Sequence, residues 1–200
     1  MNTLIAGATG NTGARIVRKL NDGGHTPIAM HRASSDTSVL PEDTQLREAD
    51  LTNLPDDVCA DADVVVFAAG SGGDTDEEMT RKVDRDGAKR LIDLAAGKGV
   101  RRFVMLSSVG AGDPDPDSDL AHYLEAKHDA DEHLKRSGLE YTIVRPVALT
   151  DEGETGNVRL GDDVDPQGKA ARGDVAAIMA RAVGDDLMAR KVFLLETVYD

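Results

Sequence analysis

The sequence predicts an α/β protein with a doubly wound parallel β-sheet and helices on both faces. Short runs rich in Val, Ile and Leu alternate with longer amphipathic runs along the 200 residues. A glycine-rich turn joins the first such pair, and no Pro/Gly/Ser linker divides the chain. Repeated β-α units with short connections wind right-handed into one sheet. We therefore expect a single domain over residues 1–200, with a small substrate-side region around 146–172.

The individual elements follow from the spacing of apolar residues. Strands are predicted for residues 2–6, 26–31, 45–48, 63–69, 101–107, 140–145 and 191–198. The run 63–69 is apolar almost throughout, which is typical of a strand buried on both faces. Helices are predicted for 11–22, 76–98, 120–137 and 173–183, where apolar residues recur every three or four positions. Residues 55–59 are predicted to form one helical turn, and 151–171 to be irregular.

Composition limits the classes of function. The net charge of −14 argues against nucleic-acid binding, which needs a basic face. Cys59 is the single cysteine, so we expect no internal disulfide and no metal site. With no apolar run long enough to span a bilayer and no leader before the first strand, we expect a cytoplasmic protein without membrane contact. Adaptation to high salt is one hypothesis for the acidic surface, and ordinary solubility is the other.

The most informative segment is Gly7-Ala8-Thr9-Gly10-Asn11-Thr12-Gly13, which lies between the first predicted strand and helix. Glycine lets the backbone approach a phosphate without a Cβ in the way, and the unpaired N–H groups of a helix's first turn attract an anion. The order of strand, glycine turn and helix therefore predicts a dinucleotide pyrophosphate site. The alternative is a tight turn without a ligand. The predicted contacts are Gly7, Thr9, Gly10, Asn11, Thr12 and Gly13.

The residues after the second strand indicate which dinucleotide is bound. An NAD-selective protein places Asp or Glu there, whereas this chain has Arg32. A guanidinium pairs with a 2′-phosphate through two hydrogen bonds, so we predict NADP, with NAD as the alternative. A solvated surface arginine is the other interpretation of Arg32. Asp50 and Leu51 are expected beside the adenine, and the small residues Ala68, Ala69 and Gly70 beside the cofactor at the switch point of the sheet.

A second motif, Tyr123-x-x-x-Lys127, opens the helix predicted at 120–137 and follows Ser107 and Ser108 at the end of a strand. Residues four apart share one helix face. Together with the glycine turn, this combination resembles the short-chain dehydrogenase/reductase superfamily, which has a Rossmann fold. The chain is most similar to its compact, atypical NAD(P)-binding members, which begin Gly-Ala-Thr-Gly-x-Thr-Gly. The resemblance extends over nearly the whole chain and is specific for fold and cofactor but not for substrate.

The resemblance implies the roles of the site residues. Tyr123 is expected to give and take a proton, Lys127 to hold the nicotinamide ribose, and Ser108 to orient the substrate carbonyl; Ser107, Pro146 and Val147 are expected to contact the cofactor. An ammonium ~4 Å from a phenol attracts the phenolate by ~4 kcal/mol at an effective dielectric of about 20, or roughly three pKa units. The interpretation without catalysis makes all three ordinary structural residues.

One feature departs from the superfamily. The fourth helix of classical members carries an Asn that takes part in a proton relay, and this chain has Asp84 and Asp86 on that helix instead. The leading prediction is an NADP(H)-dependent oxidoreductase acting on a small carbonyl or alcohol. A cofactor-binding sensor without catalysis is the alternative, and a sugar-nucleotide epimerase or dehydratase the third, disfavoured by the short substrate-side region. A small molecule is the expected partner, and a monomer and a homodimer are both open.

Overall fold

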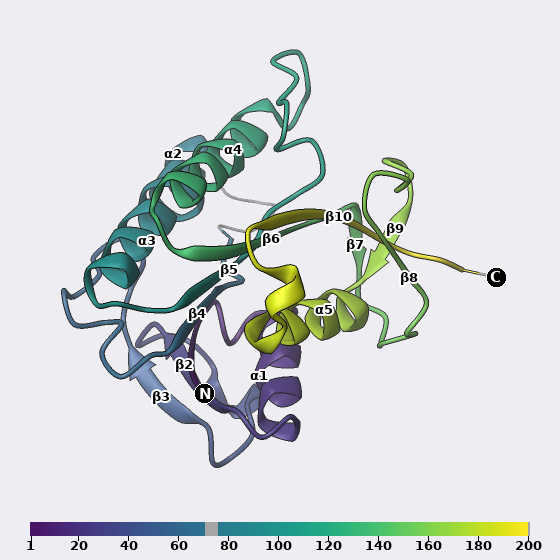
Figure 1. The fold of residues 1–200 in the computed structure, drawn as a ribbon. Helices are drawn as coiled ribbons and strands as arrows, with labels where there is room; N and C mark the ends of the chain where they lie inside the picture. The colour runs from purple at the N-terminus through teal and green to yellow at the C-terminus, as the bar shows by residue number, and fades with distance from the viewer. Residues whose placement is uncertain (71–75, 200) are drawn as a thin grey trace.

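Seven parallel strands and one antiparallel edge strand form the central sheet of the computed structural model, which describes residues 1–70 and 76–199 (Figure 1). The chain crosses from the third strand, at one edge, to the fourth strand beside the first, and this crossing creates the switch point of a doubly wound sheet. The predicted fold class is thus confirmed. From edge to edge the strands are β3 (Gln45–Glu48), β2 (Thr26–His31), β1 (Asn2–Ala6), β4 (Val64–Phe67), β5 (Arg102–Leu106), β6 (Glu140–Pro146), β10 (Lys191–Thr197) and β8 (Val158–Leu160).

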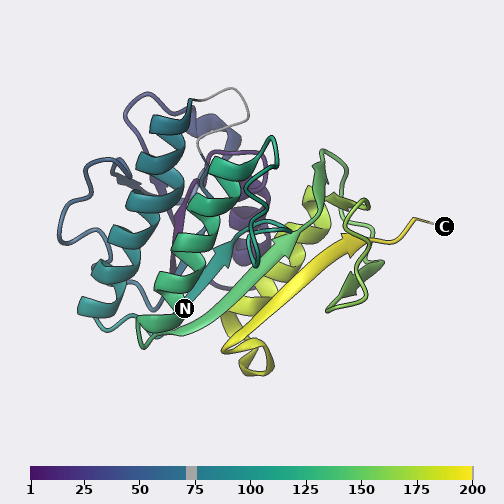
Figure 2. The same cartoon turned by 90° about the horizontal axis from the view of Figure 1, so that it is seen from above.

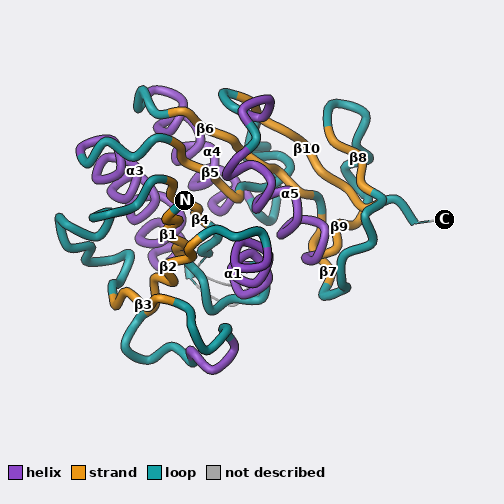
Figure 3. The backbone as a smooth tube through the Cα atoms, turned by 60° about the horizontal axis from the view of Figure 1, so that its bottom comes forward, coloured by secondary structure: helices purple, strands orange, loops and turns teal. Residues whose placement is uncertain are grey.

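Helices cover both faces of the sheet, as Figures 1 and 3 show. One face carries α1 (Gly13–Asp22) and α5 (Arg172–Gly184), which pack against each other. The other carries α2 (Glu77–Thr80), the π-helical turn η2 (Arg81–Gly87), α3 (Ala88–Gly97) and α4 (Ala121–Arg136). Two short 3-10 turns, η1 (Thr37–Val39) and η3 (Asp186–Met188), are further helical elements of the described residues. In the part of the chain described, no helix has the length and apolar character needed to cross a membrane.

The core consists of two apolar clusters, one on each side of the sheet, because successive strand residues point to opposite faces. Val64 and Val66 of β4 pack in the cluster under α1 and α5, while Val65 and Phe67 pack in the cluster under α3 and α4. All four are fully buried. The apolar run predicted as a doubly buried strand therefore has that role.

Two predictions about irregular segments were wrong. Residues 151–171 contain β8 and β9 (Lys169–Ala171), and β9 pairs in parallel with the unpredicted β7 (Ala148–Thr150), on the β10 side of the sheet in Figure 2. Each of these strands has three residues, which is too short to show an alternating pattern. Residues 55–59 form a hydrogen-bonded turn, with the Val58 N–H donating to the Pro55 carbonyl at 3.1 Å, and not a helix.

The helix predicted at 76–98 is interrupted in its middle by η2. Gly87 ends this turn so close to the loop after β3 that an added Cβ would lie 2.9 Å from the Leu51 Cβ. Asp84, in the middle of the turn, is fully buried. The periodicity of the apolar residues is compatible with a continuous helix, so only the tertiary contacts reveal the wider turn.

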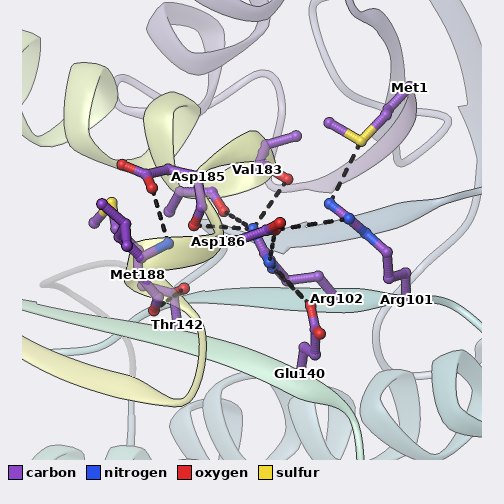
Figure 4. A network of polar contacts seen from close by, with 11 residues as sticks. Met1, Arg101, Arg102, Glu140, Thr142, Val183, Asp185, Asp186 and Met188 are labelled. Atoms are coloured by element: carbon purple, nitrogen blue, oxygen red, sulfur yellow. Dashed lines mark hydrogen bonds and ion pairs between the residues drawn. The ribbon is translucent and has the colours of Figure 1, made fainter.

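A fully buried arginine at the amino end of the sheet ties β5 to the end of α5 (Figure 4). The Arg102 guanidinium donates to the carbonyls of Ala182 and Asp185, both at 3.1 Å, and pairs with Glu140 at 2.9 Å and Asp186 at 2.7 Å. Carbonyls in the last turn of a helix are unpaired within it and attract a cation. The buried Arg102 therefore provides hydrogen-bond donors for the carbonyls at the end of α5.

Candidate active site

The glycine turn between β1 and α1 is shaped by contacts that exclude side chains. Gly7 has a φ of +79°, and an added Cβ would lie 2.6 Å from the backbone of Ala69. At Gly13 it would lie 2.0 Å from the Gly7 carbonyl oxygen. Thr12 precedes the helix, and among the described residues its side chain makes no cap for the first turn. The N–H groups of Ala14 and Ile16 donate to the carbonyls of Gly10 and Thr12, at 2.9 and 3.0 Å, so within the described residues the Gly13 N–H is left available to an anion.

A cavity of about 440 Å³ extends from this turn along the carboxyl ends of the parallel strands. It lies at the switch point, where ligands bind in sheets of this kind. Its lining includes the predicted contacts Gly7, Thr9, Gly10, Arg32, Asp50, Leu51, Ala68, Ala69 and Gly70. It also includes Met30, His31, Ser35, Ala49, Thr52, Met79 and Val83, none of which was among the predicted contacts. Residues of α2 and η2 were missed because their inward face depends on the packing of those turns.

The end of the cavity beside β2 is cationic at the point where a ribose is expected. Arg32 is exposed, its N–H donates to the Ser35 hydroxyl at 3.2 Å, and its guanidinium forms no hydrogen bond or ion pair within residues 1–70 and 76–199. Asp50, the acidic residue of this end, accepts from the N–H and hydroxyl of Thr52, both at 2.8 Å. These bonds, with the Arg32 charge, lower the pKa of Asp50. Its carboxylate is thus held by its own loop.

Outside the lining of the cavity, the structure brings Tyr123 and Lys127 together on one face of α4, and Lys127 is linked to the lining through the Ala69 carbonyl. The Lys127 Nζ lies 5.7 Å from the centre of the Tyr123 ring and 5.6 Å from that of Phe67. Tyr123 is half-buried, and in the part of the chain described its hydroxyl makes no hydrogen bond. The phenol is thus free to bind a further group.

The Lys127 ammonium is buried, with 3% of its side chain exposed, and its protons are directed at protein atoms. Nζ lies 2.9 Å from Asp84 Oδ1 and 3.4 Å from each of the carbonyl oxygens of Ala69 and Leu106. An ammonium has three donors, so this set accounts for all of them. Lys127 would hold a ribose, as predicted, only by exchanging one of the two longer bonds.

Ser107 and Ser108 follow β5 but differ in their surroundings. The buried Ser107 hydroxyl donates to Asp131 Oδ2 at 2.8 Å. Ser108 is half-buried, and its hydroxyl makes no hydrogen bond within the described residues. A hydroxyl has one proton, so Ser107 is left as an acceptor while Ser108 keeps its proton for another group.

Asp131 lies one turn beyond Lys127 on α4 and is fully buried. Its Oδ2 accepts from Arg145 Nε at 3.0 Å and pairs with Arg145 Nη2 at 2.9 Å. Burial raises the pKa of Asp131, and the Arg145 charge and the Ser107 hydrogen bond offset only part of this effect. Asp84, Lys127, Asp131 and Arg145 thus form a neutral cluster of two acids and two bases. We call it the carboxyl-end cluster.

The remaining predicted contacts lie outside the lining of the cavity. Pro146 and Val147 are buried at the end of β6, with the Val147 N–H donating to the Leu195 carbonyl at 3.0 Å. Asn11 lies within reach of the segment after β7, since its amide nitrogen is 3.5 Å from Asp151 Oδ1. Arg172 pairs with the same carboxylate at 2.9 Å. Asn11 therefore faces this segment.

Comparison with known proteins agrees with this geometry. Residues 7–186 match the protein family described as NAD(P)H-binding. A Bacillus subtilis protein named the uncharacterized sugar epimerase YhfK is 36% identical over 201 residues, covering 96% of this chain and 92% of the relative.

Solved structures are similar over nearly the whole chain. A Bacillus halodurans protein, provisionally titled an NAD-dependent epimerase/dehydratase, has a TM-score of 0.91 at 36% identity and covers 99% of this chain and 94% of its own. A Lactococcus lactis oxidoreductase, ylbE, has a TM-score of 0.85 at 28% identity, with 99% and 91% covered. The family match extends from the glycine turn to η3 and includes the whole cavity. The chain therefore belongs to the NAD(P)H-binding family of Rossmann-fold proteins.

Proposed function

We propose that the protein is an NADP(H)-dependent oxidoreductase, similar to the short-chain dehydrogenases/reductases, that transfers a hydride to or from a small carbonyl or alcohol. The observation that carries this proposal is the cavity whose lining combines Gly7, Thr9 and Gly10 of the glycine turn with Arg32 and Gly70. Its lining supplies the glycine turn for phosphates and a cation for a ribose substituent. A dinucleotide needs both.

The preference for NADP rests on the charges around the end of β2. Arg32 is free within the described residues to pair with a 2′-phosphate, and Ser35 lies beside it. Asp50, the acidic residue that lines the cavity within the described part of the chain, accepts hydrogen bonds from Thr52. A guanidinium forms paired, charge-assisted hydrogen bonds with phosphate, which a ribose hydroxyl cannot match.

Replacing Arg32 tests this preference. Arg32→Ala removes the partner of the 2′-phosphate, so calorimetric titration should show NADPH affinity falling about 10- to 100-fold, as for a lost charge-assisted pair of about 1.5–3 kcal/mol. NADH affinity should change by less than about twofold. Arg136→Ala, at an exposed position on the last turn of α4, is the matched control and should change neither. Equal losses for both cofactors would remove Arg32 from the site.

The roles of the side chains in the proposed reaction follow from which of their hydroxyl groups lack a hydrogen-bond partner in the described part of the chain. When bound, the cofactor supplies or accepts the hydride. Ser108 and Tyr123 retain their protons for the substrate oxygen, Ser108 to orient it and Tyr123 to donate to it. Ser107 donates to Asp131, so it is suited to accept from the carboxamide of the cofactor. Since Asp84 balances the charge of Lys127, the lysine's main contribution is to fix this end of the cavity.

Substitution of the tyrosine tests the mechanism. Tyr123→Phe removes the proton donor, and turnover of NADPH against a panel of aldehydes, ketones, quinones and flavins should fall about 100- to 10,000-fold. NADPH affinity should remain within about twofold of wild type. Tyr141→Phe, on the amino-terminal half of β6, is the control and should retain full turnover. Unchanged turnover in Tyr123→Phe would end the proposed mechanism.

A sensor without catalysis is the second candidate, and one observation favours it: the Lys127 ammonium is fully occupied by protein atoms. Tight NADPH binding without turnover of any substrate would support it. An epimerase, as the names of two relatives suggest, would instead convert a sugar nucleotide without net consumption of cofactor.

A further inference from the structure

The turn η2 carries a buried carboxylate, Asp84, that was not among the residues predicted for the site. Asp84 has no exposed surface, and its Oδ1 lies 2.9 Å from the Nζ of Lys127. Two fully desolvated opposite charges seldom stabilise a fold more than well-packed apolar side chains of the same size would. Stability alone therefore does not explain why Asp84 and Lys127 are charged residues.

The local backbone places this carboxylate at the cavity wall. π-helical turns occur mostly as short insertions within helices, frequently at functional sites. In η2 the adjacent residues Val83 and Asp84 both turn inward, Val83 to the cavity lining and Asp84 to Lys127. An added Cβ at Gly70, another lining residue, would lie 3.4 Å from Asp84 Oδ1. The ion pair thus lies directly behind the wall of the cavity.

Three elements converge on the ammonium from different sides. The carboxylate comes from η2, while the carbonyls of Ala69 and Leu106, at the ends of β4 and β5, accept at 3.4 Å. Of these contacts only the one with Asp84 is short and charged. Without it, two long hydrogen bonds to neutral carbonyls would have to hold a buried cation.

We propose that Asp84 is the positioning residue for Lys127, fixing the ammonium behind the cofactor cavity and keeping it charged there. Asp84 itself touches neither cofactor nor substrate, and it acts through Lys127. The inference rests on the proposed function only in assigning the cavity to a cofactor. The geometry of the ion pair is independent of that assignment.

The electrostatics of the surroundings support the assignment. Burial by itself lowers the pKa of Lys127, and the Asp84 carboxylate, with Tyr123 and Asp131 on α4, more than reverses this effect, so that its pKa is raised. The Asp131 charge is already paired with Arg145 of β6. Asp84 is thus the dominant counter-ion, and its removal should leave the effect of burial largely unopposed.

The ionisation of Lys127 provides a direct test. In Asp84→Asn, NMR titration of lysine-labelled protein should show Lys127 losing its proton below about pH 10, whereas in wild type it stays protonated. Asp86→Asn is the matched control, because Asp86 lies on the same turn with an exposed side chain paired to Arg85. It should behave as wild type. A Lys127 resonance that titrates identically in Asp84→Asn and wild type would overturn the proposal.

NADPH titration adds a functional readout. In Asp84→Asn the dissociation constant for NADPH should rise at least about tenfold between pH 7 and pH 9.5, following the loss of the lysine charge. Wild type and Asp86→Asn should change by less than about twofold over the same range. A uniform loss of affinity at every pH would indicate a merely structural role and contradict the proposal. If wild type binds no NADPH, the proposed function fails, and the NMR titration still decides the role of Asp84.

A double variant covers the case in which Asp84→Asn unfolds. Asp84→Asn/Lys127→Met removes both charges, so it should have a higher melting temperature than Asp84→Asn alone, since no unpaired charge remains buried. A double variant no more stable than the single one would show that the two residues are not coupled, and would overturn the proposal.

Discussion

Two buried arginines on neighbouring strands are held in opposite ways. Arg102, at the amino end of β5, binds the last carbonyls of α5 and two carboxylates whose side chains are partly exposed, Glu140 at 39% and Asp186 at 77% (Figure 4). Arg145, near the carboxyl end of β6, pairs with Asp131, which has no exposed surface. The first arginine pairs with carboxylates that remain in contact with water, whereas the second belongs to the carboxyl-end cluster beside the cavity.

The difference lies in how much charge each end of the sheet removes from water. At the amino end, the partners of Arg102 stay largely hydrated and the helix end attracts a cation, so the desolvation of charge is limited. At the carboxyl end, two acids and two bases are desolvated together, and an apolar core would be at least as stable. Under the proposed function, these charges fix the side chains beside the cavity at particular positions.

The largest effect expected from this comparison is on stability at the amino end. Arg102→Met leaves the carbonyls of α5 and the Glu140 carboxylate without their partner, so the free energy of unfolding should fall by about 3–5 kcal/mol. Chemical denaturation measures this directly. The affinity of the folded protein for NADPH should not change, because Arg102 lies at the opposite end of the sheet from the cavity.

The neighbouring residue is the control. Arg101 has a side chain that is 46% exposed and lies 3.7 Å from Asp186, so Arg101→Met should lower stability by less than about 1 kcal/mol. If Arg102→Met lowered the free energy of unfolding as little as Arg101→Met, the network around Arg102 would not stabilise the fold. This result would contradict the comparison between the two ends of the sheet.

A smaller effect concerns how stability depends on pH, and it has opposite signs at the two ends. Hydrogen bonds from the Leu187 N–H and Arg181 lower the pKa of Asp185 below its usual 3.8, so its contribution is present above that pH and is lost as the pH falls through the folded-state pKa. Burial raises the pKa of Asp131, so its contribution is full below 3.8 and is lost as the pH rises through the folded-state pKa.

Urea unfolding between pH 3 and pH 7 distinguishes the two carboxylates. Asp185→Asn should remove part of the free energy of unfolding that is gained as the pH rises from 3. Asp131→Asn should instead remove a contribution to the free energy of unfolding that decreases as the pH rises. Each change involves at most one proton. Slopes that change in the same direction in both variants would contradict the contrast between the two ends.

Much of the fold was predictable because it depends on local patterns. The glycine turn, the apolar run around Val64–Phe67 and the amphipathic helices each predict their element without reference to the rest of the chain. Nine of the predicted site residues, from Gly7 to Gly70, line the cavity, since the topology brings the ends of parallel strands to one edge. Whether these residues and Ser108, Tyr123 and Lys127 serve the proposed function stays a prediction.

The carboxyl-end cluster was not predictable because it is formed by pairs distant in sequence. Asp84 and Lys127 are 43 positions apart, and only the π-helical turn brings the carboxylate inward. Asp131 looks like one more acid on a charged helix, and its burial depends on β6 lying beside β5. Arg102 is a charged residue followed directly by an apolar strand run, but its partners Glu140 and Asp186 are 38 and 84 positions away in the sequence.

The central claim is that the cavity at the carboxyl end holds NADP(H) next to Tyr123, and a crystal structure with NADP bound tests it most directly. We expect the pyrophosphate against the first turn of α1, the 2′-phosphate in contact with the Arg32 guanidinium, and the nicotinamide ring beside the Tyr123 hydroxyl. A nucleotide bound elsewhere, or a nicotinamide ring separated from that hydroxyl by more than one bridging water, would contradict the account.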